Sequence, residues 1–284
     1  MENLINLYKK IYKITKEEFE LENQIKKVYI FNEIRKTGIL FIPTNCTSLL
    51  IVLPGAGFND KSKNFLLKNF KYLMKNNIGI CIYILNDGNL DKEDHIFFEY
   101  FKEKIGEIRG IVKYAKDKLK IKDINLLGIS FGGVIGFIVT ALEKDIKKSI
   151  FIASGVNLEF ITWRSLLRFK LKKDCNRIVC RKMHKVYKNL IKNNLYDEIL
   201  NLPKKCFLYE PITYLNILRD RKILMINGIF DMIVPFYCAL EVKKILKNTK
   251  ILWYPSTHLT LRFFFPFIKK RVLNFLKNEN LHRD

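Results

Sequence analysis

The sequence is short of acidic residues. Its 284 residues include 28 Asp and Glu against 51 Lys and Arg, which gives a formal net charge of +23. Such an excess ordinarily indicates a nucleic-acid or anionic membrane partner. Here 40 of the basic residues are Lys and only 11 are Arg, beside abundant Ile and Asn. Lysine on solvated faces is the simpler explanation, and because no nucleic-acid-binding module is recognisable, we expect no nucleic-acid partner.

Cysteine pairs and a secretory signal are also missing. The cysteines are Cys46, Cys81, Cys175, Cys180, Cys206 and Cys238, without a C-x-x-C pair. This excludes the usual disulfide frameworks and zinc sites and predicts reduced, mostly buried cysteines of a cytoplasmic protein. Segment 1–20 mixes charged residues with apolar ones at helical spacing and has no uninterrupted hydrophobic region. No secretory signal is therefore predicted.

A hydrophobic run of the length that spans a bilayer is also missing. Segment 126–142 has 17 residues without a charge, a little short for a membrane span. We interpret it as a buried strand, a tight glycine turn and a buried helix that begins near Phe131. Because 49% of the residues are hydrophobic and 13% aromatic, the chain can form a large core, and disordered and collagen-like classes are excluded.

Short apolar runs typical of strands alternate with helical patterns along most of the chain. The predicted strands are 24–34, 38–42, 48–53, 79–85, 124–128, 149–153, 222–227 and 249–254. The predicted helices are 61–76, 96–119, 131–143, 235–247 and 265–277. From the third onward, most strands are fully apolar, as expected of strands covered on both faces. The pattern predicts an α/β fold: a mostly parallel central sheet with an antiparallel start and helices on both faces.

About sixty residues between the strands near 153 and 222 contain no convincing strand. Within them, apolar residues recur at helical spacing and predict a long amphipathic helix: Leu171, Cys175, Ile178, Val179, Met183, Val186, Tyr187, Leu190 and Ile191. We expect 159–207 to be a helical cap inserted over the end of the sheet, with 1–158 and 208–284 as the core.

The most informative motif is Gly128-Ile129-Ser130-Phe131-Gly132, which matches G-x-S-x-G where a predicted strand meets a predicted helix. In this context a nucleophilic serine lies on a strained turn, and small neighbours keep the strand and helix from clashing. Ser130 also precedes a helix N-terminus, where free backbone N–H groups and the helix dipole favour negative charge. We predict that Ser130 is a nucleophile.

A serine nucleophile needs a base, and the chain has four histidines. His258 is favoured because it follows the last predicted strand, where a loop can bring it over the carboxyl edge of the sheet. His95 lies in an acidic loop, His184 on the polar side of the predicted cap helix, and His282 in the C-terminal tail. We expect these three to be solvated histidines.

The base in turn needs a carboxylate on its other ring nitrogen. Asp231 follows the predicted strand 222–227, at the carboxyl edge of the sheet, and is our candidate; alternatively it caps the helix after Pro235. Asp220 precedes that strand and lies at the wrong edge. Glu159 is a weaker alternative. The chain order Ser130, Asp231, His258 is that of α/β-hydrolase triads.

Acyl transfer also requires donors for the developing oxyanion, typically backbone N–H groups. The N–H of Phe131, directly after the nucleophile, is one predicted donor. The glycine turn 53–57, which follows the third strand, offers the second, with the N–H of Ala56 preferred over that of Gly57. The same turn also simply ends the strand.

Together these segments, in this order, resemble the α/β-hydrolase superfamily of serine esterases, lipases and acyl hydrolases, over about residues 24–280. The resemblance implies cleavage of a small-molecule acyl ester through an acyl-enzyme on Ser130, with no metal or organic cofactor. Many members carry His-Gly where this chain has Pro54-Gly55, which affects the subfamily but not the backbone donor.

Other functions use the same residues. A thioesterase, amidase or peptidase would need the same triad, and a non-catalytic relative could bind anionic lipid through the cap. Residues 160–205 contain 13 Lys and Arg against 3 Asp and Glu. The basic residues that flank the apolar stripe of the cap helix are Arg168, Lys172, Arg177, Arg181, Lys185 and Lys188. They could contact an anionic membrane surface or attract anionic substrates. The aromatic-rich segment 261–267 either lines an acyl pocket or starts the last helix.

Overall fold

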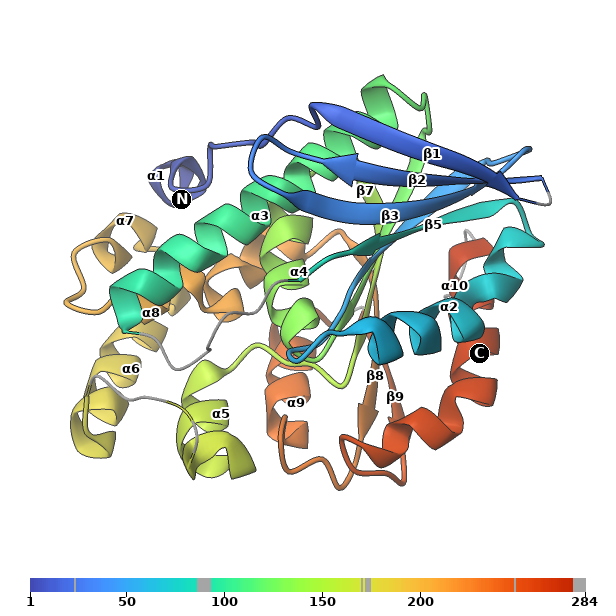
Figure 1. Cartoon of the computed structure of the whole chain (residues 1–284). Helices are drawn as coiled ribbons and strands as arrows, with labels where there is room; N and C mark the ends of the chain where they lie inside the picture. Colours follow the sequence, from blue (N-terminus) through green and yellow to red (C-terminus); the bar gives the residue numbers. More distant parts are fainter. Residues whose placement is uncertain (23, 86–92, 170, 172–174, 248, 278–284) are drawn as a thin grey trace.

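A mixed sheet runs through the computed structural model, which describes residues 1–22, 24–85, 93–169, 171, 175–247 and 249–277. Within these residues it has nine strands in the order β1-β2-β3-β5-β4-β6-β7-β8-β9 (Figure 1). The strands are β1 Lys16–Glu22, β2 Ile25–Phe31, β3 Lys36–Pro43, β4 Ser48–Leu53, β5 Ile78–Tyr83, β6 Asp123–Ile129, β7 Ile146–Ile152, β8 Lys222–Gly228 and β9 Lys250–Tyr254. The pairs from β1 to β5 are antiparallel and those from β5 to β9 are parallel. The predicted antiparallel start and parallel remainder are confirmed.

Helices cover both faces of the sheet because its central strands are apolar on both sides. Every residue of β4 and β5 is buried. The helices of the two layers are α2 Asp60–Met74, α3 Asp94–Asp117, α4 Phe131–Leu142, α9 Phe236–Ile245 and α10 Phe265–Lys277. One core is formed with α3, α4 and α9, and the other with α2 and α10. This three-layer arrangement confirms the predicted fold class.

A helical segment connects β7 to β8 and contains no strand among its described residues. It comprises α5 Leu158–Arg164, η1 Leu166–Phe169, α6 Arg177–Lys192, α7 Tyr196–Ile199, α8 Cys206–Tyr209 and η2 Pro211–Leu218. Figure 1 shows α5, α6, α7 and α8 together at one end of the molecule, away from the antiparallel strands. We call 158–218 the helical insertion.

The amphipathic helix of the insertion is shorter and rotated relative to the prediction. It begins at Arg177, and its buried face is Cys180, His184, Tyr187 and Ile191. Three residues of the predicted apolar stripe, Ile178, Val179 and Val186, are instead exposed. Apolar residues occur on two sides of this helix, so the packing of its neighbours decides which side is buried.

The N-terminal segment also differs from its helical pattern. Only α1, Glu2–Asn6, is helical, and Lys16–Glu22 forms the edge strand β1. Phe19 and Leu21 of β1 are exposed. Charged residues along the strand are a feature of sheet edges, where they oppose pairing with other chains.

The charge-free segment 126–142 is divided between β6 and the 12-residue helix α4. In the described part of the chain, no helix combines the length and apolar character that a bilayer span requires. Cys81, Cys180 and Cys238 are buried.

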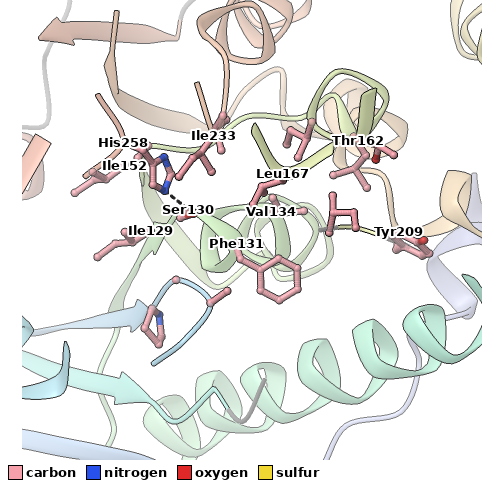
Figure 2. Close-up of a pocket in the computed structure, with 18 of the residues that line it drawn as sticks. Ile129, Ser130, Phe131, Val134, Ile152, Thr162, Leu167, Tyr209, Ile233 and His258 are labelled. Atoms are coloured by element: carbon pink, nitrogen blue, oxygen red, sulfur yellow. Dashed lines mark hydrogen bonds between the residues drawn. The ribbon is translucent and has the colours of Figure 1, made fainter. Parts of the chain in front are cut away.

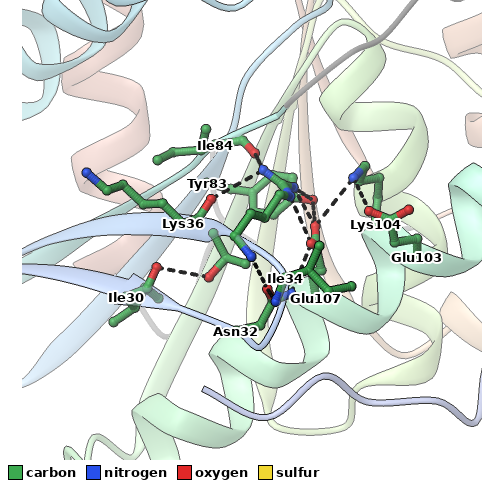
Figure 3. Close-up of polar contacts among 11 residues, drawn as sticks. Ile30, Asn32, Ile34, Lys36, Tyr83, Ile84, Glu103, Lys104 and Glu107 are labelled. Carbon is green, nitrogen blue, oxygen red and sulfur yellow. Dashed lines mark hydrogen bonds and ion pairs between the residues drawn. The ribbon is translucent and has the colours of Figure 1, made fainter. Parts of the chain in front are cut away.

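A buried ionic cluster that the sequence did not suggest joins the antiparallel strands to α3 (Figure 3). The Glu107 carboxylate, whose side chain is 0% exposed, pairs with the Arg35 guanidinium and lies 3.7 Å from the Lys104 ammonium. Asn32 and the Tyr83 hydroxyl also donate to Glu107. Burial and the Glu107 charge hold the pKa of Tyr83 well above its usual value, so this hydroxyl keeps its proton.

We expect Glu107→Gln to lower the free energy of unfolding by about 3–5 kcal/mol, because it leaves Arg35 and Lys104 without their shared buried counter-charge. Chemical denaturation measures this change. Glu99→Gln is the matched control on α3, since Glu99 pairs with Lys102 at the protein surface and exposed pairs contribute about 0–1 kcal/mol. Equal losses in the two variants would contradict the prediction.

Candidate active site

Ser130 lies at the junction of β6 and α4, in the strained turn that the motif predicts. Its backbone has φ 51° and ψ −118°, a conformation that non-glycine residues rarely adopt. A Cβ on Gly128 would lie 2.5 Å from the Cα of Gly133, and one on Gly132 would collide with the carbonyl of Leu53. Only glycine therefore lets β6, α4 and the end of β4 approach closely enough to hold this turn.

His258 lies in the loop after β9 and faces Ser130 (Figure 2). Its Nε2 is 2.9 Å from Ser130 Oγ. The side chain is 13% exposed, so the ring is largely shielded from water. The loop is held by reciprocal bonds between Thr257 and Thr260, in which each hydroxyl accepts the backbone N–H of the other residue.

Asp231 lies in the loop after β8 and orients His258. Its Oδ2 is 2.7 Å from His258 Nδ1, and its Oδ1 accepts the N–H groups of Ile233 and Val234, each at 2.8 Å. The side chain is fully buried. The N-cap position of α9 is Pro235, so Asp231 does not cap that helix. With Oδ2 accepting Nδ1–H, the unprotonated Nε2 faces the serine hydroxyl.

Ser130, Asp231 and His258 follow the carboxyl ends of β6, β8 and β9, respectively. The alternatives lie elsewhere: Asp220 is exposed before β8, and His95 is exposed on α3. Glu159 pairs with Lys188 at 3.7 Å. His282 lies outside the described residues.

Two backbone segments adjoin Ser130 where an oxyanion would form. A Cβ on Gly55 would lie 3.3 Å from Ser130 Cβ, so the loop after β4 passes directly beside Ser130, and Ala56 follows in that loop. Phe131 is the first residue of α4, and its N–H has no acceptor one turn earlier in the helix. Both predicted donors thus belong to segments that flank Ser130.

A cavity of about 940 Å³ opens at Ser130 and His258. Its walls are mainly apolar, as the close-up of Val134, Leu167 and Ile233 indicates (Figure 2). The insertion contributes much of the lining, from Leu158 to Glu210. Leu261 and Phe265 also line it. Because α10 begins at Phe265, segment 261–267 both lines the cavity and starts the last described helix. A volume of this size accommodates a small organic molecule.

The prediction that His184 is a solvated histidine is wrong. His184 is buried in the insertion, where its Nδ1 is 3.0 Å from the carbonyl oxygen of Cys180 and its Nε2 is 3.2 Å from Oε2 of Glu210. Burial lowers the pKa of His184, but the Glu210 charge and the contacts with Cys180 outweigh burial and raise it to about 11. Both residues line the cavity. Glu210 was missed, because nothing in its local sequence indicates a buried partner.

The chain matches the model of the α/β-hydrolase fold over residues 46–177. Among solved structures, an esterase of Pyrococcus furiosus, Pf2001, is 17% identical, with a TM-score of 0.62 over 94% of this chain and 97% of that one. A cold-adapted esterase from an Arctic intertidal metagenomic library is 13% identical, with a TM-score of 0.59 over 93% and 100%. Est1E from Butyrivibrio proteoclasticus is 17% identical, with a TM-score of 0.56 over 93% and 100%. The comparison with curated proteins gives no match.

Proposed function

We propose, from the α/β-hydrolase fold of this chain, that it is a serine esterase that hydrolyses small-molecule carboxylic esters. The observation that carries the proposal is the continuous chain of hydrogen-bond contacts from Asp231 through His258 to Ser130, at 2.7 and 2.9 Å. The mainly apolar cavity at Ser130 suits an acyl group. That esterases occur among the solved structures of the same fold agrees with the proposal.

In the proposed reaction, His258 Nε2 takes the hydroxyl proton of Ser130 as Oγ attacks the ester carbonyl carbon. The N–H groups of Phe131 and Ala56 stabilise the resulting oxyanion. His258 then returns the proton to the departing alcohol oxygen, and the acyl-enzyme remains. A water molecule repeats the sequence: His258 takes its proton, the hydroxide attacks the acyl carbon, and Ser130 leaves with the proton back on Oγ.

We further propose that residues 159–207 act as the cap of this site. Leu167 and other side chains of this segment line the cavity at Ser130. Because a cavity wall sets the length and shape of the group that reaches the nucleophile, this segment would set substrate preference rather than chemistry.

A fluorophosphonate probe tests the function directly. We expect the wild-type protein to be labelled once, with the mass increase on the peptide that contains Ser130, because an activated serine forms a stable adduct with phosphorus. p-Nitrophenyl esters of increasing chain length should be hydrolysed and, while they last, should slow labelling, because they compete with the probe for the same serine. A protein that neither labels nor hydrolyses any ester would overturn the proposal and favour a non-catalytic binding function.

A second proposed property is contact with an anionic membrane surface through α6. This helix exposes Ile178 and Val186, at 69% and 55%, beside the exposed basic residues Arg181, Lys182 and Lys185. Apolar side chains within a basic face are the pattern of interfacial helices. Lys188 is less available because it lies 3.6 Å from Glu241. Lys172 lies outside the described residues, while Arg168 and Arg177 are exposed.

Vesicle sedimentation tests this contact. Vesicles of phosphatidylcholine with added phosphatidylserine should carry the protein down, and vesicles of phosphatidylcholine alone should not. Changing Arg181, Lys182 and Lys185 together to Gln should weaken binding by roughly 100-fold, since each basic residue contributes about 1 kcal/mol near an anionic surface. The control changes Lys68 and Lys71 on α2 and Lys75 directly after it, which are also exposed. Equal binding to both vesicle types excludes a role for the charge.

A further inference from the structure

The cavity at Ser130 has one side where its walls are exposed to solvent. Among the described residues that line it, the exposed ones come from two segments: the loop after β4 with the first half of α2, and the loop after β9 with η3, Thr260–Phe264. They are Ala56, Lys61, Phe65, Leu259 and Arg262. The other lining residues are buried or half-buried. We call the exposed set the mouth of the cavity.

The mouth carries two cationic side chains, from elements that pack together. Phe65 of α2 and Phe265 of α10 are in edge contact, with ring centroids 5.2 Å apart, and Figure 1 shows both helices on the same side of the sheet. Lys61 lies one turn before Phe65 on α2. Arg262 lies one turn before Phe265 along η3. An anionic group at the mouth therefore meets positive charge from both segments.

The two cations are not neutralised by neighbouring carboxylates. Segment 53–76 has Asp60 as its one acidic residue; its side chain pairs with Lys63 and does not line the cavity. Segment 255–277 has no acidic residue. Within the described part of the chain, neither Lys61 nor Arg262 forms an ion pair, and the Arg262 guanidinium packs on the Phe263 ring. Both positive charges are therefore available to a ligand.

The carboxylates that do line the cavity belong to the insertion or contact it, and each already has a partner. They are Asp94, Glu159 and Glu210, which contact Tyr209, Lys188 and His184, respectively. The remaining walls there are mainly apolar, with Leu167 and Leu171 among them. The cavity is therefore polarised, with accessible positive charge at its mouth and apolar walls under the insertion.

The ligand that matches this polarity has an anionic end and an apolar end. Lysine and arginine both bind carboxylate and phosphate oxygens, and the guanidinium does so through two parallel hydrogen bonds. An ammonium group at the mouth would be repelled. The loop after β4 carries both Ala56 of the mouth and Gly55 beside Ser130, so the anionic end lies on the Ser130 side of the cavity.

We propose that Lys61 and Arg262 form an anion-binding subsite at the mouth of the cavity, which binds a carboxylate or phosphate group of the ester substrate. This inference rests on the proposed esterase function and names its substrate class: esters in which one part is apolar and the other is anionic. The apolar part occupies the space under the insertion. Carboxylate and phosphate share the same charged oxygens, and the experiment separates them.

Matched esters test the subsite kinetically. One arm compares alkanoate esters of ω-hydroxy carboxylates with those of the corresponding primary amides, which have a similar shape without the charge. A second arm places the carboxylate or amide in the acyl part, as p-nitrophenyl monoesters, and a third replaces the carboxylate by a phosphate monoester. At low ionic strength, wild-type kcat/KM in one arm or more should favour the anionic ester by about tenfold, as expected of two exposed ion pairs. Equal values in all arms overturn the proposal.

The preference should also depend on salt, because both cations are exposed. An ionic strength of about 1 M shortens the Debye length to about 3 Å. The anionic ester should then lose most of its advantage, while kcat/KM for the amide changes little. A preference that survives in full at this ionic strength comes from shape and not from charge, and it contradicts the subsite.

Changing Lys61 and Arg262 together to Gln should remove the preference, through a loss in kcat/KM for the anionic ester. Changing both to Glu should reverse it, so that an ammonium ester of the same length becomes the better substrate. The matched control changes Lys68 and Arg271 to Gln, which removes the same charge from exposed positions on α2 and α10 that do not line the cavity. Equal losses in the control and the Gln variant would mean that the net charge of the protein, and not a subsite, attracts the ester.

A binding arm separates this proposal from the proposed function. Calorimetry with the Ser130→Ala protein compares the affinities of the same anionic and amide esters without turnover. Tighter binding of the anionic ester supports the subsite even if the wild-type protein hydrolyses none of them, which would sink the esterase proposal alone. Equal affinities overturn the subsite even if the esters are hydrolysed.

Discussion

Replacing Ser130 with alanine is expected to lower kcat for a p-nitrophenyl ester by roughly 10⁴–10⁶-fold. In the proposed reaction, Oγ of Ser130 forms the acyl-enzyme, and the variant removes this atom while the cavity and the proposed backbone donors remain. A residual rate above that of water is expected, since oxyanion stabilisation and binding survive loss of the nucleophile. Steady-state kinetics on freshly purified protein measure the loss, and KM should change much less than kcat.

Two properties make Ser130→Ala a clean test. Alanine keeps the Cβ, so the strained backbone at φ 51° faces the same steric demand as with serine, and the thermal unfolding midpoint should not change. Ser62→Ala is the matched control, because Ser62 lines the same cavity and its hydroxyl contacts Asn59 instead of a histidine. If Ser130→Ala retains more than about one hundredth of the wild-type kcat, the nucleophile has been assigned to the wrong residue.

The arrangement around Ser130 could be predicted from the sequence because each part obeys a local rule. The turn that brings β6 against α4 leaves no room for side chains at Gly128 and Gly132, so both positions of the motif must be glycine. Carboxyl ends of parallel strands share one edge of the sheet, so residues directly after predicted strands converge there. Asp231 and His258 could therefore be selected by their positions relative to strands, without any knowledge of side-chain contacts.

Features that depend on distant partners could not be predicted in this way. β1 is an edge strand that pairs on one side only, so its exposed Phe19 and Leu21 gave no sign of burial. The buried face of α6 was misassigned because apolar residues lie on two sides of the helix. His184 is charged and buried only because Glu210, 26 residues further along the chain, meets it. Glu107 and Arg35 are likewise 72 residues apart, and no periodicity marks such a pair.

The second large effect is expected at Asp231, where asparagine should lower kcat by about 10⁴-fold. In the wild type, Oδ1 accepts from the N–H groups of Ile233 and Val234, which leaves Oδ2 for His258 Nδ1. In Asp231→Asn the amide oxygen keeps the two backbone bonds, so the NH₂ group must face His258. Nδ1 then becomes the acceptor, and the ring proton moves to Nε2. Because the protonated Nε2 faces Ser130, it cannot accept the hydroxyl proton.

This argument predicts loss of the base through the wrong tautomer and not through loss of fold. The melting temperature of Asp231→Asn should stay close to that of the wild type because the three side-chain hydrogen bonds at this position are kept. Fluorophosphonate labelling, in contrast, should slow in parallel with kcat. Asp220→Asn is the matched control, since Asp220 is exposed before the same strand, and it should leave kcat unchanged. Comparable losses in both variants would mean that charge near β8, rather than the orientation of His258, controls the reaction.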